Sequence, residues 1–137
     1  EALSDLHGVR KPLFLKIAPD LDHNDIKLIA DLLLEFKIDA IIATNTTIAR
    51  DAVRELEFGE EMGGLSGAPV RTASTEVVKS LKQYLGDAIP IIGVGGILSG
   101  KDAQEKIAAG ASLVQLYSGL IYRGPKLISE CAAILKK

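Results

Sequence analysis

Four short apolar runs, with helical patterns between them, restrict the folds that this chain can adopt. The runs cover residues 13–17, 40–44, 91–94 and 112–116. Each run is rich in Ile, Val or Leu without clean alternation, which is typical of strands covered on both faces, as in parallel sheets. The sequence therefore predicts four parallel strands of an α/β protein.

Apolar residues at helical spacing predict a helix after each of the first two runs. The first apolar stripe covers residues 26–34 and the second covers residues 77–85. Asp22 or Asn24 is expected to cap the start of the first helix, because a short polar side chain accepts from the first free N–H groups. Gly86 is expected to end the second helix.

Two further helices are predicted in the last third of the chain. Ser99 and Asp102 have the spacing of a capping box, and Gly110 is expected to stop the helix that they open. Pro125 is expected to begin a last helix with its apolar face within residues 127–135. Strands that alternate with helices imply parallel pairing through right-handed crossovers. Both a doubly wound open sheet and part of a (β/α)₈ barrel fit this order.

Composition excludes several classes of protein. The chain has 137 residues, of which 47% are hydrophobic and 25% charged, so residues 1–137 suit a single globular segment. A net charge of −2 argues against nucleic acid as the main partner. The single cysteine, Cys131, excludes an internal disulfide, and no spacing of His, Cys or acidic residues indicates a metal site. Because the chain begins at Glu1 without Met, we expect it to be a piece of a longer protein.

Polar residues and glycines follow each predicted strand, where both architectures bind their ligands. Gly95 and Gly96 end the third strand just before a capped helix, a place suited to a phosphate group. Leu98 occupies the third glycine position of the dinucleotide fingerprint, and no acidic residue follows at the expected distance. These glycines therefore predict a mononucleotide or simple phosphate site; the alternative is that they only allow tight turns.

The barrel interpretation accounts for these glycines better than the open sheet does. Barrels commonly bind phosphate with the loops after their last two strands, together with a short extra helix. Gly95 and Gly96 follow the third predicted strand, and residues 117–119 follow the fourth. We therefore expect this chain to be the second half of a barrel, with an exposed edge on its first and last strands.

Lys16 and the segment 44–47 are further candidates for chemistry. Lys16 lies in an otherwise apolar strand, and three interpretations stay open: a Schiff-base nucleophile, a fixed cation beside a developing anion, or a strand-end lysine that reaches solvent. The Thr-Asn-Thr-Thr segment offers hydroxyls and an amide to a ligand rich in hydrogen-bonding groups. The same composition is also common in a strand-exit turn.

Five motifs in order resemble the class 2 dihydroorotate dehydrogenases. They are Lys-Ile-Ala-Pro-Asp from Lys16, Thr-Asn-Thr-Thr from Thr44, Gly-Gly-Leu-Ser-Gly from Gly63, Ile-Gly-Val-Gly-Gly from Ile92 and Gly-Ala-Ser-Leu-Val-Gln-Leu-Tyr from Gly110. Each motif is weak alone, but the ordered set is specific and extends from about Lys11 to the end. The resemblance is to the C-terminal half of the quinone-reducing class.

The resemblance implies a (β/α)₈ barrel that binds FMN at the carboxyl ends of its strands. Such an enzyme oxidises dihydroorotate to orotate in pyrimidine biosynthesis and passes the electrons to a quinone. It is associated with the bacterial or mitochondrial inner membrane through N-terminal helices, whereas the segment present here is expected to be soluble. The family's catalytic serine base would lie upstream, so we expect no catalytic residue in this segment and no dehydrogenase activity from it alone.

The resemblance also implies roles for individual residues. Two would contact the flavin: Lys16, which would stabilise the negative charge of the reduced ring, and Thr44. Asn45 and Thr46 would bind orotate. The remaining residues would bind the ribityl-phosphate arm and its phosphate: Ser66, Gly67, Gly95, Gly96, Tyr117 and Ser118.

Two other interpretations of the chain stay open. One is another phosphate-binding barrel enzyme, such as an aldolase that forms a Schiff base on Lys16. The other is a non-catalytic half-barrel that interacts with partners through its strand edges. In each half-barrel interpretation, the missing N-terminal half or a second copy of this chain is expected to cover those edges.

Overall fold

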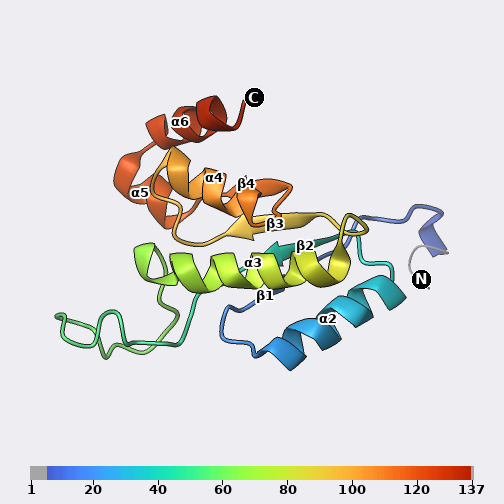
Figure 1. Ribbon diagram of the computed structural model, residues 1–137, viewed down its shortest axis with the longest axis horizontal. Coiled ribbons are helices and arrows are strands. Elements are labelled where there is room, and N and C mark those ends of the chain that lie inside the picture. The colour runs from blue at the N-terminus through green and yellow to red at the C-terminus, as the bar shows by residue number, and fades with distance from the viewer. Residues whose placement is uncertain (1–5, 137) are drawn as a thin grey trace.

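The elements of the computed structural model follow the predicted alternation of strands and helices (Figure 1). The structure describes residues 6–136, so Glu1 lies outside it. The elements are β1 (Phe14–Ile17), α2 (His23–Glu35), β2 (Ala40–Ala43), the 3₁₀ helix η1 (Ala68–Val70), α3 (Arg71–Leu85), β3 (Ile91–Val94), α4 (Gly100–Ala108), β4 (Leu113–Gln115), α5 (Ser118–Arg123) and α6 (Lys126–Leu135). The four predicted strands and four predicted helices are confirmed, whereas η1 and α5 had not been predicted as separate elements.

The order of the strands distinguishes between the two candidate architectures. All neighbouring strands pair in parallel, in the order β1-β2-β3-β4. A doubly wound sheet reverses its strand order at a switch point, whereas here each strand lies beside its predecessor. The covering helices keep the same order, because α2 packs on α3 and α3 on α4. The chain therefore forms four consecutive βα units of a (β/α)₈ barrel, as predicted.

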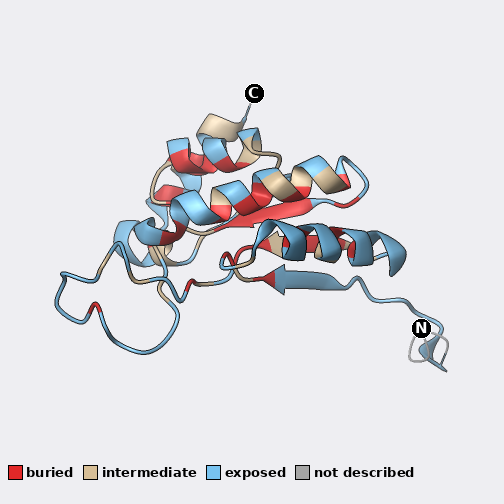
Figure 2. Ribbon diagram, turned by 60° about the horizontal axis from the view of Figure 1, so that its bottom comes forward, coloured by how far each residue is buried: buried red, intermediate tan, exposed pale blue. Residues whose placement is uncertain are grey.

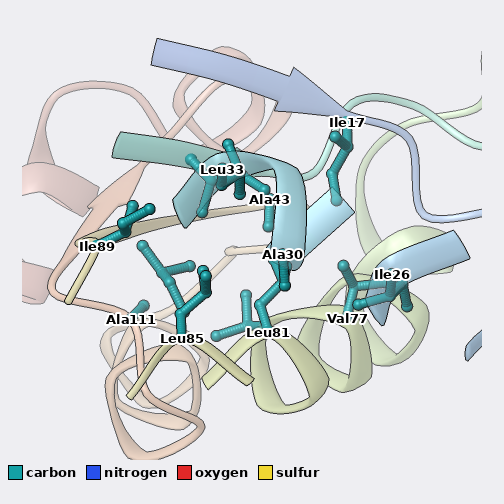
Figure 3. Packing of buried hydrophobic residues seen from close by; sticks show 13 residues of the cluster. Ile17, Ile26, Ala30, Leu33, Ala43, Val77, Leu81, Leu85, Ile89 and Ala111 are labelled. Carbon is teal, nitrogen blue, oxygen red and sulfur yellow. The ribbon is translucent and has the colours of Figure 1, made fainter. Parts of the chain in front are cut away.

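The main hydrophobic core lies between the sheet and its covering helices (Figure 3). Helices α2 and α3 face each other across it, and Leu33 and Leu81 are almost completely buried there. Ile41 of β2 and Ile91 of β3 close the core from the sheet side. The predicted apolar stripes of both helices are therefore the faces that pack.

Burial differs strongly between inner and outer strands (Figure 2). Every residue of β3 is buried, whereas β1 is exposed until Ile17 and β4 has no fully buried residue. The prediction that the strands are covered on both faces is therefore wrong for β1 and β4. Within the described residues, each of these outer strands has a neighbour on one side only, which leaves the two edges that the barrel interpretation expected.

The predicted helix ends are confirmed in most cases. Asp22 caps α2 by accepting from the backbone N–H of Asp25 at 2.9 Å, and Ser99 caps α4. Gly86 follows α3 with a φ of 54°, a conformation that favours glycine. Helix α3 begins at Arg71, well before its predicted apolar stripe, and no side chain caps it.

A long loop between β2 and η1 extends from the body of the molecule (Figure 1, teal to green). An isolated antiparallel bridge joins its two ends, where the N–H of Thr47 donates to the carbonyl of Leu65 at 3.0 Å and the reverse bond measures 2.8 Å. Inside the loop, the Arg50 guanidinium donates to the carbonyls of Glu61 and Gly63. The loop is therefore fastened at its base. Among residues 6–136, no helix has the length and apolarity needed to cross a bilayer.

Candidate functional site

A cavity of about 590 Å³ opens at the carboxyl ends of the four strands. It has the size of ordinary small-molecule sites, which range from about 300 to 1,000 Å³. Every site residue predicted from the sequence lines it: Lys16, Thr44, Asn45, Thr46, Ser66, Gly67, Gly95, Gly96, Tyr117 and Ser118. The fold thus gathers into one site residues that lie far apart along the chain.

Lys16 reaches this cavity because side chains alternate along β1. Its neighbour Ile17 is buried in the core against the helices, so Lys16 projects from the opposite face of the strand. Lys16 forms no ion pair with any described residue. A primary ammonium group is therefore available to an anion in the cavity.

The end of β2 is held by a local network of hydrogen bonds. Thr44 is 1% exposed, and its hydroxyl donates to the carbonyl of Asn45 at 2.9 Å. The N–H of Asn45 donates to the carbonyl of Ile17 at 2.7 Å, which joins the exits of β1 and β2. The side-chain oxygen of Asn45 accepts from the N–H of Thr46 at 3.0 Å. Its NH₂ group has no partner among the described residues and stays available to a ligand.

Asp20 has a structural task that the sequence did not reveal. The hydroxyl of Thr47 donates to one of its carboxylate oxygens, and the N–H of Ile48 donates to the other at 3.2 Å. Asp20 therefore ties the segment after β1 to the segment after β2. It does not pair with Lys16, although the two residues lie four positions apart.

The end of β3 is built from backbone rather than side chains. Gly95 and Gly96 have φ angles of 117° and 70°, a conformation that favours glycine, so the turn itself requires these residues. A Cβ atom on Gly96 would lie 2.3 Å from the Cβ of Arg71, so the loop packs directly on the first turn of α3. The N–H groups of Gly95 and Gly96 donate to no described residue. Two backbone donors in a turn that lines the cavity are therefore unpaired within the described residues.

The long loop and α5 meet beside these glycines. The hydroxyls of Ser66 and Ser118 lie 2.9 Å apart, which joins the Gly-Leu-Ser-Gly motif to the residues that follow β4. Gly67 has a φ of 82°, and a Cβ there would come within 3.7 Å of the Ser118 Cβ. Hydroxyl groups and free backbone N–H groups are donors that suit an anionic oxygen.

Several residues that line the cavity had not been predicted. They are Val70, Val94, Ile97, Gln115 and Leu116, whereas Gly119 belongs to the segment 117–119 that was expected after the fourth strand. Gln115 could have been found by the signal that identified Lys16, because both are polar residues inside an apolar strand. The apolar residues carry no such signal, since their side chains look like ordinary core.

Two other titratable side chains, Cys131 and His23, lie away from this cavity. Cys131 lies on the buried face of α6, and burial raises the pKa of its thiol, which makes it a poor nucleophile. His23 lies on the surface, 2.5 Å from the hydroxyl of Tyr84. Within residues 6–136, no cluster of three His, Cys, Asp or Glu side chains could hold a metal ion.

Comparison with known proteins relates this geometry to one family. A model of the family "Dihydroorotate dehydrogenase" matches residues 2–137. The chain is 74% identical over 135 residues to the dihydroorotate dehydrogenase (quinone) of Polynucleobacter necessarius, and 73% identical to that of Polynucleobacter asymbioticus. These matches cover 98% of this chain but 39% of each relative, so the chain spans about two-fifths of their length.

Solved structures agree with the sequence comparison. The crystal structure of DHODH from Eimeria tenella in complex with ferulenol matches with a TM-score of 0.86 at 43% sequence identity. That match covers 92% of this chain and 33% of the Eimeria chain. The ligand-free enzyme from the same organism gives the same TM-score and identity. From its sequence and its fold, this chain belongs to the dihydroorotate dehydrogenase family.

Proposed function

We propose that this chain supplies one side of the flavin and orotate site of a quinone-dependent dihydroorotate dehydrogenase. The observation that carries the proposal is that all residues with an expected role line one cavity at the carboxyl ends of the strands. The named relatives support this reaction over the aldolase and the non-catalytic half-barrel. Since the chain spans two-fifths of those relatives, the complete site would need the rest of the barrel.

The donor set of the cavity fits FMN as the flavin. The free N–H groups of Gly95 and Gly96 and the hydroxyls of Ser66 and Ser118 suit the phosphate of a mononucleotide. Side chains at both glycines would collide with α3, so the phosphate loop is a close backbone approach. Gly67 and Tyr117 line the same end of the cavity and would border the ribityl-phosphate arm.

The other end of the cavity suits the ring system and the substrate. Lys16 would hold its ammonium beside the flavin and favour the anionic form of the reduced ring, which makes it a fixed cation rather than a Schiff-base nucleophile. Thr44 would contact the ring, while Asn45 and Thr46 would bind and orient orotate through hydrogen bonds. FMN, when bound, would accept the electrons from dihydroorotate and pass them to the quinone.

Other parts of the enzyme would complete this site. None of the residues assigned here is a proton-abstracting base, so the chain by itself should not oxidise dihydroorotate. The rest of the barrel, or a second copy of this chain, would cover the outer edges of β1 and β4. Membrane association and contact with the quinone would depend on the part of the relatives that lies outside the matched 39%.

A segment swap tests the proposal. The 135 aligned residues of the Polynucleobacter necessarius relative are replaced with those of this chain, giving the swapped enzyme. We expect the swapped enzyme to purify with FMN and to reduce a quinone with dihydroorotate at a rate within about tenfold of the parent enzyme. A folded swapped enzyme without flavin would contradict the proposal.

A ligand comparison on the chain alone tests the phosphate end. Flavin fluorescence is titrated with the 137-residue chain, using FMN and riboflavin, which differ only in the phosphate. We expect FMN to bind at least tenfold more tightly, since hydrogen bonds to a charged group contribute about 1.5–3 kcal/mol. Equal affinities would remove the phosphate from the proposed site.

A further inference from the structure

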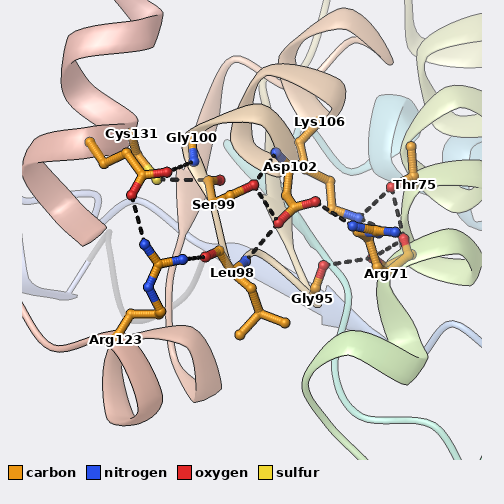
Figure 4. A network of polar contacts seen from close by, with 12 residues as sticks. Arg71, Thr75, Gly95, Leu98, Ser99, Gly100, Asp102, Lys106, Arg123 and Cys131 are labelled. Atoms are coloured by element: carbon orange, nitrogen blue, oxygen red, sulfur yellow. Dashed lines mark hydrogen bonds and ion pairs between the residues drawn. The ribbon is translucent and has the colours of Figure 1, made fainter. Parts of the chain in front are cut away.

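A buried lysine lies behind the glycine loop of the cavity (Figure 4). Lys106 of α4 has a relative exposure of 0%, and it does not line the cavity. Its ammonium donates to the carbonyl of Arg71 at 3.0 Å, to the hydroxyl of Thr75 at 2.6 Å and to the hydroxyl of Ser74. These acceptors are all neutral oxygens, and Lys106 forms no ion pair with a described residue. Burying an ammonium group without an ion pair costs stability. Stabilisation of the fold therefore does not explain why Lys106 is there.

The Arg71 carbonyl limits what the Ser74 hydroxyl can do. A carbonyl oxygen has two lone pairs, and Lys106 and Thr75 already donate to this one, Thr75 at 2.8 Å. Ser74 has a single hydroxyl proton and two carbonyls within reach, that of Arg71 at 3.1 Å and that of Gly95 at 3.3 Å. Because the Arg71 carbonyl already accepts from Lys106 and Thr75, the Gly95 carbonyl is the less occupied acceptor for the Ser74 proton.

The orientation of the Gly95 carbonyl decides what the cavity presents. In a planar trans peptide the C=O and the next N–H point in opposite directions. When Ser74 holds the Gly95 carbonyl on the helix side, the N–H of Gly96 points to the other side, where the cavity lies. Glycine at 93 leaves room for the lysine stem, since a Cβ there would lie 3.2 Å from the Cβ of Lys106.

We propose that Lys106 is a positioning residue for the phosphate: acting through Ser74, it fixes the Gly95–Gly96 peptide with its N–H directed into the cavity. The inference rests on the proposed function, because it assumes that the cavity takes the phosphate of FMN. Burial, and next the positive charge of Arg71, lower the pKa of Lys106 to about 8, so the group is still largely protonated at neutral pH. Without Lys106, the Ser74 hydroxyl loses the donor that holds its oxygen in place, and its bond to the Gly95 carbonyl is weakened.

Variants of the chain test this relay by comparing FMN with riboflavin. In Lys106→Met and in Ser74→Ala we expect FMN affinity to fall about 10- to 100-fold, the contribution of one hydrogen bond to a charged group, with riboflavin affinity unchanged within twofold. The double variant should bind FMN no more weakly than Ser74→Ala, because the lysine acts through the serine. Lys101→Met and Ser80→Ala, on the same two helices and outside the cavity, are the matched controls.

The outcomes separate the inference from the proposed function. If the unmodified chain does not bind FMN more tightly than riboflavin, the proposed function and the inference both fail. If it prefers FMN and both variants keep that preference, or if their effects simply add, the inference alone fails. Glycine amide NMR signals provide a readout of geometry: inorganic phosphate should shift the Gly96 N–H signal in the unmodified chain and in Lys101→Met, and much less in Lys106→Met. An equal shift in all three would overturn the relay.

Discussion

The two ends of the cavity are built in opposite ways. At the β1–β2 end, an exposed outer strand carries a charged side chain, Lys16, to the ligand position. At the β3–β4 end, a fully buried strand leads into a glycine turn that offers backbone N–H groups, backed by the buried Lys106. The first end depends on which side chains are present. The second depends on the precise path of the backbone, and therefore on packing behind the cavity.

The largest expected effect comes from adding one methyl group to the backbone end. In Gly96→Ala the new Cβ would meet the Arg71 Cβ at 2.3 Å and its backbone at 2.5 Å, at a φ of 70°. We expect a loss of more than about 3 kcal/mol in the free energy of unfolding, by denaturant titration, and loss of FMN binding. Gly124→Ala is the control, because its φ is 69° and nothing lies within 4 Å of its Cβ. A similar loss of unfolding free energy in the two variants would show that the packing of Gly96 on α3 does not matter.

Removing the cation from the side-chain end should change chemistry with little effect on stability. In the swapped enzyme, Lys16→Met should lower turnover by roughly 10²- to 10³-fold, the effect of losing a group that stabilises developing negative charge. In the 137-residue chain, the same variant should change the free energy of unfolding by less than about 0.5 kcal/mol, since Lys16 is exposed there on an outer strand. Lys11→Met is the control. Borohydride trapping of a carbonyl substrate on Lys16 would instead favour the aldolase.

The buried lysine should give the backbone end a distinct dependence of stability on pH. The pKa of Lys106 falls from 10.5 to about 8 in the folded chain, so between these values the unfolded chain binds more protons. Stability contributed by this group should therefore rise with pH in that window, by up to about 1.4 kcal/mol per pH unit, and stay flat below pH 8. The measurement is the difference in unfolding free energy between the unmodified chain and Lys106→Met. A difference in unfolding free energy that does not change with pH would contradict this prediction.

The outer strand should also govern self-association, which is the smallest effect expected. Phe14 on β1 is 48% exposed beside an unpaired edge. If a second copy covers that edge, Phe14→Lys should weaken association several-fold, because part of one aromatic side chain is no longer buried. Light scattering over a range of concentrations measures this. Phe58→Lys in the long loop is the control, and a chain that is monomeric at all concentrations would contradict the expectation.

The sequence predicted the positions of the strands better than the architecture of the sheet and the starts of the helices. The runs of Ile, Val and Leu located each strand within a residue or so of its bounds, since few other structures tolerate such runs. Periodicity did not distinguish a barrel from an open sheet, because that choice depends on strand order. The start of α3 was missed because Arg71 has no capping side chain before it. Helix α5 has six residues and no cap, too little for a periodic pattern.

The candidate site was predicted more completely than the network behind it. Polar residues at strand ends were recognisable because parallel strands bring their carboxyl ends to one edge. Lys106 was not recognised, since a lysine between Glu105 and Ile107 in an amphipathic helix reads as a solvent-facing residue. Only the fold shows that this position faces α3, where the hydroxyls of Ser74 and Thr75 accept hydrogen bonds from its ammonium group.

Because a bridge fastens the base of the long loop, the loop can be altered without moving the residues of the site. The paired backbone of Thr47 and Leu65 holds both ends in place, whatever chain length connects them. Closing a longer loop costs little additional entropy, because the cost grows only with the logarithm of its length. The middle of the loop around Leu56, which is 63% exposed, is thus a permissive point for inserting a peptide tag or a fluorescent label.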